Sequence, residues 1–383
     1  MIFEKVERED EEPKEHNESS YSFLNRSSWS SCEKIREFLN LTTKGYPESE
    51  TNEIVSRIKC GNDRHFDSAV FELILYQVFI SLGCELTPHP VLPNGQKSRP
   101  DFLVETPKGE KFYLEAVLAS AKTNVNDRAE KLKGTVYNSI DKISHHNFFV
   151  EVDDTGNPNT PPKGRALKKS LKKWLDSLDP DQVIKDVDSF GFEHRPQFDW
   201  EHDGWYVIFR AIPIKPERRG KGQRTIGMYG SNGGFHDSWS PIRDAIIEKG
   251  RKYGVLDKPL VIAVNSSACI LERIDEMQAL FGQERFSFTG ASEPSFSRAP
   301  NGAWHSKGGP RYTRISAAWI FKHLMPWSVS TSTHTLYCNP YSTLEIPDFL
   351  FQFPHGKVAN GKMVLNEGAA LTSVLGLHEE WPN

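Results

Sequence analysis

The sequence predicts a mixed α/β protein, and three observations support this class. Apolar residues recur at helical spacing over residues 68–82. Three strand-like segments joined by turn residues follow, at 84–91, 99–104 and 111–119. Helical and strand patterns then continue to alternate from residue 126 onward, which is typical of a sheet covered by helices. The length of 383 residues allows one large domain or two ordinary ones.

Composition indicates which partners and which cellular compartment to expect for this protein. The formal net charge of -4 excludes a basic field over the whole molecule. The five cysteines are scattered, without the paired spacing of a zinc site or a redox motif, so we expect a reduced, cytoplasmic protein. There is no cationic start followed by an apolar run and no stretch of 18 apolar residues. We therefore expect neither a standard secretion signal nor a membrane partner.

The N-terminal region divides into two predicted parts. Residues 1–20 are rich in Glu and nearly devoid of apolar residues, which predicts a disordered acidic tail, because such a segment buries too little to offset the entropy of ordering. Residues 21–60 contain two short helical patterns and form a helical lead-in. The long helix that follows has a candidate N-cap at Asp67 and a candidate C-terminal glycine at Gly83.

Residues 61–155 form the predicted core. After the long helix and the three strands, a helix over 126–145 and a short strand over 148–152 complete the order helix, three strands, helix, strand. Residues 156–383 are a predicted C-terminal α/β extension, which carries a basic amphipathic helix and a basic loop.

Three carboxylates stand where apolar residues are expected. Glu72 falls on the inward face of the long helix, and Asp101 and Glu115 lie seven residues on either side of Lys108, the centre of a predicted hairpin turn. A hairpin centred there places Asp101 opposite Glu115 on one face of the sheet. Two carboxylates on opposed strand positions repel each other, and a bound divalent cation would neutralise them. The sequence therefore predicts a site that holds Mg²⁺ or Mn²⁺.

These residues resemble the PD-(D/E)XK nuclease superfamily, which has the restriction-endonuclease-like αβββαβ fold with a mixed sheet. The resemblance rests on Pro100-Asp101, the hairpin, Glu115 and the preceding helix with Glu72. It implies that Asp101, Glu115 and the backbone carbonyl of Ala116 bind the metal, with Glu72 as an accessory ligand. It also implies phosphodiester hydrolysis, in defence against foreign DNA or in repair.

One position departs from the family pattern. Val117 occupies the place of the lysine that activates or orients the attacking water. Variant members carry this lysine on the following helix, where Lys131, Lys133 and Lys142 are available. Spacing does not separate Lys133 from Lys142. The resemblance favours Lys142, because residues 137–143 are similar to a helix segment of uncharacterised bacterial members.

The expected function is a Mg²⁺-dependent nuclease that acts on nucleic acid, preferably DNA, as a homodimer or with a partner protein. Basic residues of the helix 164–178 and the loop 215–224 are expected to bind backbone phosphates. They are Lys168, Lys172, Arg218, Arg219, Lys221 and Arg224. Two alternatives stay open: a catalytically inactive nucleic-acid-binding module of the same fold, and a structural or interaction protein whose acids form an internal ion-pair network.

Overall fold

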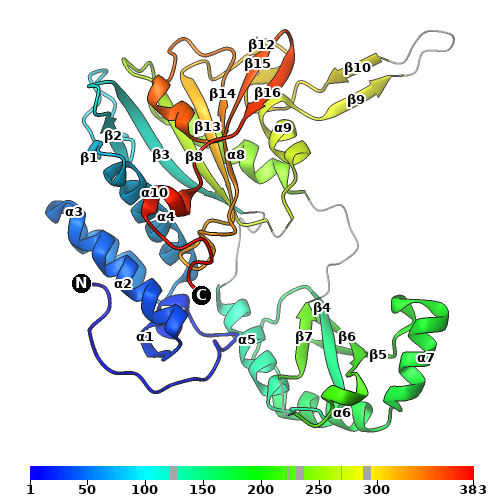
Figure 1. The fold of residues 1–383 in the computed structure, drawn as a ribbon. Coiled ribbons are helices and arrows are strands. Elements are labelled where there is room, and N and C mark those ends of the chain that lie inside the picture. Colours follow the sequence, from blue (N-terminus) through cyan, green and yellow to red (C-terminus); the bar gives the residue numbers. More distant parts are fainter. Residues whose placement is uncertain (121–126, 222–223, 230–236, 269, 288–294) are drawn as a thin grey trace. The chain divides into compact units, whose positions relative to one another are not determined.

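The chain folds into two compact units (Figure 1). The computed structural model describes residues 1–120, 127–221, 224–229, 237–268, 270–287 and 295–383. The first unit contains residues 1–12, 19–121 and 237–383, and the second contains residues 13–18 and 122–236. The second unit is therefore an insertion into the first. The predicted boundary at 155/156 is wrong, because it falls inside this insertion.

The first unit is built on an eight-stranded mixed sheet, in the order β1-β2-β3-β8-β13-β14-β15-β16. Its strands are β1 (Glu85–Pro88), β2 (Phe102–Glu105), β3 (Lys111–Ala119), β8 (Leu260–Ser266), β13 (Ile315–Lys322), β14 (His334–Cys338), β15 (His355–Ala359) and β16 (Lys362–Asn366). The pairs β3–β8, β8–β13 and β14–β15 are parallel, and the other neighbours are antiparallel. The predicted mixed α/β class is confirmed.

Helices cover both faces of this sheet. The helices of the first unit are α1 (Ser20–Arg26), α2 (Ser30–Gly45), α3 (Glu48–Lys59), α4 (Asp63–Ser81), α8 (Trp239–Lys252), α9 (Arg273–Phe281) and α10 (Leu371–Leu375). Phe112 and Leu114 of β3 share a core with α4, whereas Tyr113 and Val117 share another with α8 and α9. Side chains alternate between the faces of a strand, so the position of a residue in β3 decides which helix it meets.

The long predicted helix is α4, but it begins earlier than expected. Its N-cap is Asn62, whose side chain accepts from the backbone N–H groups of Arg64 and His65, so the predicted cap at Asp67 is wrong. Gly83 follows the helix with a φ of 77°, as the predicted C-terminal glycine requires. After α9, the two short antiparallel strands β9 (Glu284–Ser287) and β10 (Ser295–Arg298) project from the body of the first unit (Figure 1).

The second unit has its own sheet and core. It contains α5 (Asp127–Asp141), α6 (Gly164–Asp176), α7 (Pro180–Phe190), β4 (Phe148–Thr155), β5 (Gln197–His202), β6 (Trp205–Pro213) and β7 (Ile226–Tyr229). The strand order is β5-β6-β4-β7, and side chains of all three helices pack on this sheet. The predicted helix 126–145 and strand 148–152 exist as α5 and β4. They belong to this unit and do not close the first sheet.

In the first unit, the helix and the strand that complete the predicted order after β3 are α8 and β8. The chain leaves β3, forms the second unit, and returns as α8 and then β8, which pairs in parallel with β3. Within the first unit the order is α4, β1, β2, β3, α8, β8, so helix, three strands, helix and strand follow one another as expected. The prediction assigned the last two elements wrongly. The next helix along the chain after β3 is α5 of the second unit, whereas the next helix that packs on the first sheet is α8.

The N-terminal segment is ordered, and the predicted disordered tail is wrong. Ile2 and Phe3 are each 1% exposed in the core, and their backbone N–H groups donate to Oδ1 of Asn40 at 2.9 Å. Further along, His16 of the second unit lies 2.7 Å from Asp141. Two apolar anchors and specific polar contacts outweigh the acidic composition. The helical lead-in predicted for 21–60 is confirmed as α1, α2 and α3.

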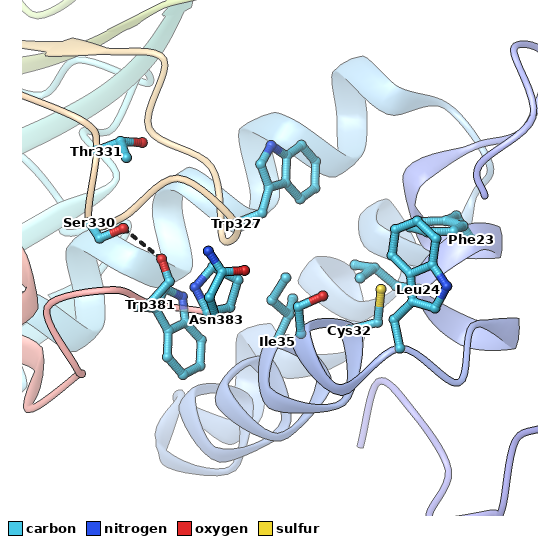
Figure 2. A pocket seen from close by; sticks show the side chains of 12 residues that line it. Phe23, Leu24, Cys32, Ile35, Trp327, Ser330, Thr331, Trp381 and Asn383 are labelled. Atoms are coloured by element: carbon cyan, nitrogen blue, oxygen red, sulfur yellow. Dashed lines mark hydrogen bonds between the residues drawn. The ribbon is translucent and has the colours of Figure 1, made fainter. Parts of the chain in front are cut away.

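A hollow of about 290 Å³ lies between α1, α2 and the C-terminal segment (Figure 2). Its walls carry Phe23, Trp29, Trp327 and Trp381. The indole N–H groups of Trp29 and Trp381 donate to the carbonyls of Glu11 and Pro326. No helix among the described residues combines the length and apolar character that a membrane span needs.

Candidate active site

Asp101 and Glu115 lie opposite each other where β2 meets β3. The register pairs Phe102 with Leu114, which places the preceding Asp101 across from Glu115. The N–H of Asp101 donates to Oε2 of Glu115 (3.2 Å), and the N–H of Ala116 donates to Oδ2 of Asp101 (2.6 Å). The predicted juxtaposition of the two acids is confirmed. Metal binding by them stays a prediction.

The same contacts mark the end of the β2–β3 ladder. Beyond the pair Phe102–Leu114, the Ala116 N–H bonds to the Asp101 carboxylate and not to a carbonyl of β2. Side-chain acceptors thus replace backbone acceptors at this point, and two carboxylates occupy the space between the strands. Glu115 is 2% exposed, whereas Asp101 is half-buried, so Glu115 is held away from bulk water and Asp101 lies at the edge of the buried region.

Burial and like charge act together on Asp101. Its pKa is raised well above the usual carboxyl value, first by burial and then by the charges of Glu115 and Glu72. The Ala116 N–H and the Lys249 ammonium act in the opposite direction without cancelling this shift. An acid with a raised pKa and a specific charge partner is typical of a functional site.

A lysine from α8 completes the pair. The Nζ atom of Lys249 contacts Oε1 of Glu115, and the Tyr253 hydroxyl also donates to this carboxylate. Burial alone would lower the pKa of Lys249, but Glu115 and then Asp101 outweigh it and raise the pKa above its ordinary value. Lys249 is therefore a protonated ammonium group beside the two acids at neutral pH.

Glu72 lies on the inward face of α4 as predicted, and it is 5% exposed. Both of its oxygens have partners: the Tyr46 hydroxyl donates to Oε1 (2.6 Å) and Nη1 of Arg57 donates to Oε2 (2.9 Å). Its charge reaches Asp101, since it contributes to the raised pKa of that group. An accessory metal role for Glu72 stays a prediction, and it requires Arg57 to release the Oε2 atom of Glu72.

The three acids do not converge as tightly as a single three-carboxylate site would require. Within the residues that the structure describes, one set of three potential ligands has all its ligand atoms within 4.8 Å of one another: Glu50, Glu53 and His89. Glu53 is exposed, and Arg57 links this set to the site through contacts with Glu53 (3.6 Å) and Glu72 (2.9 Å). Asp101 and Glu115 form the centre of the site, and Glu72 is bound instead by Arg57 and Tyr46.

The lysines predicted from the following helix lie in the second unit. Lys142 follows α5, is exposed, and its carbonyl accepts from Nζ of Lys168 (3.0 Å). Lys133 is buried and pairs with Asp154 at 2.7 Å, and Lys131 is exposed. The choice of Lys142 fails in its premise, because α5 is not the helix that follows β3 on the sheet. The ammonium that contacts Glu115 comes from Lys249.

The predicted phosphate-binding residues all lie in the second unit, and half of them are neutralised there. The ion pairs are Lys172 with Asp176 (2.8 Å), Arg219 with Asp181 (2.6 Å) and Arg224 with Asp141 (3.7 Å). Lys168 is half-buried, whereas Arg218 and Lys221 are exposed. These contacts weaken the case for a phosphate-binding surface on α6 and on the loop after β6.

The sequence contains signals that could have found Lys249. Residues 260–264 are apolar without interruption, as expected for a strand between two parallel neighbours, whereas Glu151 interrupts the strand that was chosen instead. On α8, Lys249 breaks an apolar stripe formed by Ile242, Ile246 and Tyr253. A lysine in the core-facing stripe of the helix before a central strand is the informative pattern.

Comparison with known proteins adds no assignment. No protein-family model, no curated protein and no solved structure matches this chain. The interpretation therefore rests on the residues and their geometry.

Proposed function

We propose that the protein is a metal-dependent nuclease whose site consists of Asp101, Glu115 and Lys249. The observation that carries the proposal is the contact of a half-buried lysine with the buried carboxylate of Glu115, which lies opposite the half-buried Asp101 at the end of the β2–β3 pairing. Two acids can hold a divalent metal ion, and an ammonium group can stabilise the negative charge that develops during phosphodiester hydrolysis.

The order of elements supports the resemblance to the restriction-endonuclease-like fold. With the second unit set aside, α4, β1, β2, β3, α8 and β8 follow the αβββαβ order, with an antiparallel β1–β2–β3 meander and a parallel β3–β8 pair. The lysine missing at Val117 has a substitute on the helix that follows β3 in this order, which matches the variant members of that superfamily.

The donor set fits a hard divalent cation. Asp101 and Glu115 offer carboxylate oxygens, and the carbonyl of Ala116 is the backbone ligand that the resemblance implies. The pKa of Asp101 is raised first by burial and then by the charges of Glu115 and Glu72, and Lys249 offsets this shift only in part. Bound Mg²⁺ or Mn²⁺ would supply Lewis-acid polarisation of the phosphate and a water of lowered pKa.

The residues of the chain have separate tasks in this mechanism. Lys249 stays protonated, so it stabilises negative charge developing on the phosphate and donates hydrogen bonds, but it does not act as a base. Tyr253 and the Asp101 N–H hold Glu115 in place. Asp101 must release any proton it holds before metal binds, so metal affinity should rise with pH.

Cleavage assays with purified protein test the proposal. Labelled single- and double-stranded DNA and RNA are incubated with Mg²⁺, Mn²⁺ or EDTA, using wild type, Asp101→Asn, Glu115→Gln and Lys249→Met. The matched control is Lys252→Met, which removes an exposed lysine from the same helix. Metal-dependent cleavage by wild type and Lys252→Met, with a loss of at least about a hundredfold in the other three variants, is expected. Equal activity in wild type and Asp101→Asn would refute the assignment.

One observation favours a second candidate, the structural ion-pair network. Glu115 pairs with Lys249 and Glu72 pairs with Arg57, so two of the three acids have a cationic partner without any metal. Calorimetric titration with Mn²⁺ separates the candidates. Binding that disappears in Asp101→Asn supports the nuclease, whereas no binding to wild type supports the network.

A further inference from the structure

A cationic hollow lies on the solvent side of α8, the helix that carries Lys249. Its volume is about 510 Å³, and the segment 300–311 forms its other wall. Three arginines line it: Arg243, Arg251 and Arg311. Asp244 and Glu248 are the acids at its rim. Its lining thus carries three positive and two negative charges.

The acids compensate these arginines only in part. Asp244 pairs with Arg243 (2.8 Å), whereas Glu248 pairs with Lys252 (3.3 Å), which does not line the hollow. Asp244 and Glu248 are 63% and 68% exposed, so both carboxylates extend towards water. Within the described part of the chain, Arg251 and Arg311 form no ion pair.

The guanidinium groups are held in place by neutral contacts. Nε of Arg251 donates to the Tyr312 hydroxyl (2.8 Å), and Arg311 donates to the carbonyls of Gly302 (2.7 Å) and Ala303 (3.2 Å). Tyr312 itself packs against α8 at Gly250, where a Cβ atom would meet its ring at 3.1 Å. Arginines fixed without a carboxylate partner retain free donors for an anion, and their planar fork matches a phosphate.

We propose that this hollow binds a backbone phosphate of the nucleic-acid substrate, a proposal that rests on the function proposed above. Continuity with the site supports it, because the same helix α8 carries Arg243 and Arg251 on the hollow and Lys249 in contact with Glu115. Lys249 faces the sheet, whereas Arg243 and Arg251 line the solvent side, so the bound phosphate is not the scissile one. The hollow contributes affinity for long substrates and takes no part in the chemical step.

Substrate length provides a specific test. An α-helix is about 10–12 Å across with its side chains, and the phosphates of each duplex strand advance about 3.4 Å per nucleotide along the duplex axis, so only a substrate that extends several nucleotides beyond the scissile bond reaches the hollow. Binding of 20-nucleotide and 3-nucleotide DNA is measured by fluorescence anisotropy in EDTA against NaCl concentration. The proteins carry Asp101→Asn, alone or with Arg251→Ala, Arg251→Lys, Arg243→Ala or Lys252→Ala. Circular dichroism verifies folding of each.

The expected result is a roughly three- to tenfold weaker affinity of Arg251→Ala and Arg243→Ala for the 20-nucleotide DNA. The salt slope should fall by about 1 in both, while Arg251→Lys retains the slope and Lys252→Ala retains affinity. The 3-nucleotide DNA should not distinguish the variants. Equal affinity and slope in Arg251→Ala and Lys252→Ala would overturn this proposal alone, and metal-dependent cleavage would still stand. Absence of nucleic-acid binding by the parent protein would overturn both proposals.

Discussion

Replacing Lys249 with methionine isolates the ion pair at the centre of the site. The Lys249 and Glu115 side chains are 18% and 2% exposed, so the substitution leaves a carboxylate buried without its cation. Breaking such a pair costs about 3–5 kcal/mol, and the lower end applies because the Asp101 N–H and the Tyr253 hydroxyl still bond Glu115. We expect the free energy of unfolding to fall by about 3 kcal/mol at neutral pH in EDTA.

The pH dependence of this loss has a definite sign. Because the folded pKa of Lys249 is raised, its stabilising contribution is complete below the ordinary lysine value of 10.5 and is lost only as the pH rises through the folded value. The full deficit of Lys249→Met should therefore appear at neutral pH. It should shrink under mild acid, since Asp101, with its raised pKa, binds a proton and relieves the repulsion.

Urea unfolding followed by tryptophan fluorescence measures the effect, with Lys252→Met as the control on the same helix. Lys252 and Glu248 are 38% and 68% exposed, so the control should lose less than about 1 kcal/mol. Adding Glu115→Gln to Lys249→Met should recover most of the loss, because the uncompensated charge is gone. A cost for Lys249→Met no larger than that of the control, or no recovery in the double variant, would refute the buried-pair interpretation.

Three further predictions concern the surroundings of the pair. Asp101→Asn should raise the melting temperature in EDTA and abolish the increase in melting temperature that Mn²⁺ causes in wild type. Because the folded pKa of Asp101 is raised, this group destabilises the folded protein as the pH rises above the ordinary carboxyl value of 3.8. Differential scanning calorimetry measures both effects. Arg57→Ala should cost about 2 kcal/mol in urea unfolding and make Mn²⁺ more stabilising than in wild type, since Glu72 is then free to bind it. An unchanged Mn²⁺ effect there would contradict an accessory role for Glu72. Phe3→Ala should cost about 3 kcal/mol, since Phe3 is 1% exposed, whereas a cost below about 0.5 kcal/mol would indicate a detached N-terminus.

The parts of the site that depend on local sequence were predictable. The hairpin turn is set by Pro107-Lys108-Gly109, with Gly109 at a φ of 82°, and strand periodicity then fixes which residues oppose each other. Asp101 and Glu115 are opposed for this reason, within a span of 15 residues. Glu72 is buried because α4 is apolar on nearly every side, and residues 69–76 are all buried.

The parts that depend on chain topology were not predictable in the same way. The second unit separates β3 from α8 along the chain. Its first helix and strand, α5 and β4, follow β3 directly in the sequence and therefore matched the expected order, although they belong to another sheet. The order of the elements along the chain did not show which sheet each strand joins, although the uninterrupted apolar run 260–264 favours a central strand. The N-terminal error has a different cause: composition averages over a segment, whereas two residues, Ile2 and Phe3, provide its buried apolar contacts.

The face of the sheet, more than the distance along the chain, restricts where the missing lysine can come from. Glu115 and Val117 are two residues apart on β3, so their side chains project from the same face, and Val117 packs in the core that includes α8. A lysine at position 117 would approach Glu115 from that face, and a lysine on α8 approaches from the same side. Helix α4, which carries Glu72, covers the other face. The substitute must therefore occupy the core-facing stripe of a helix on the Val117 side, and the position that interrupts this stripe on α8 is Lys249.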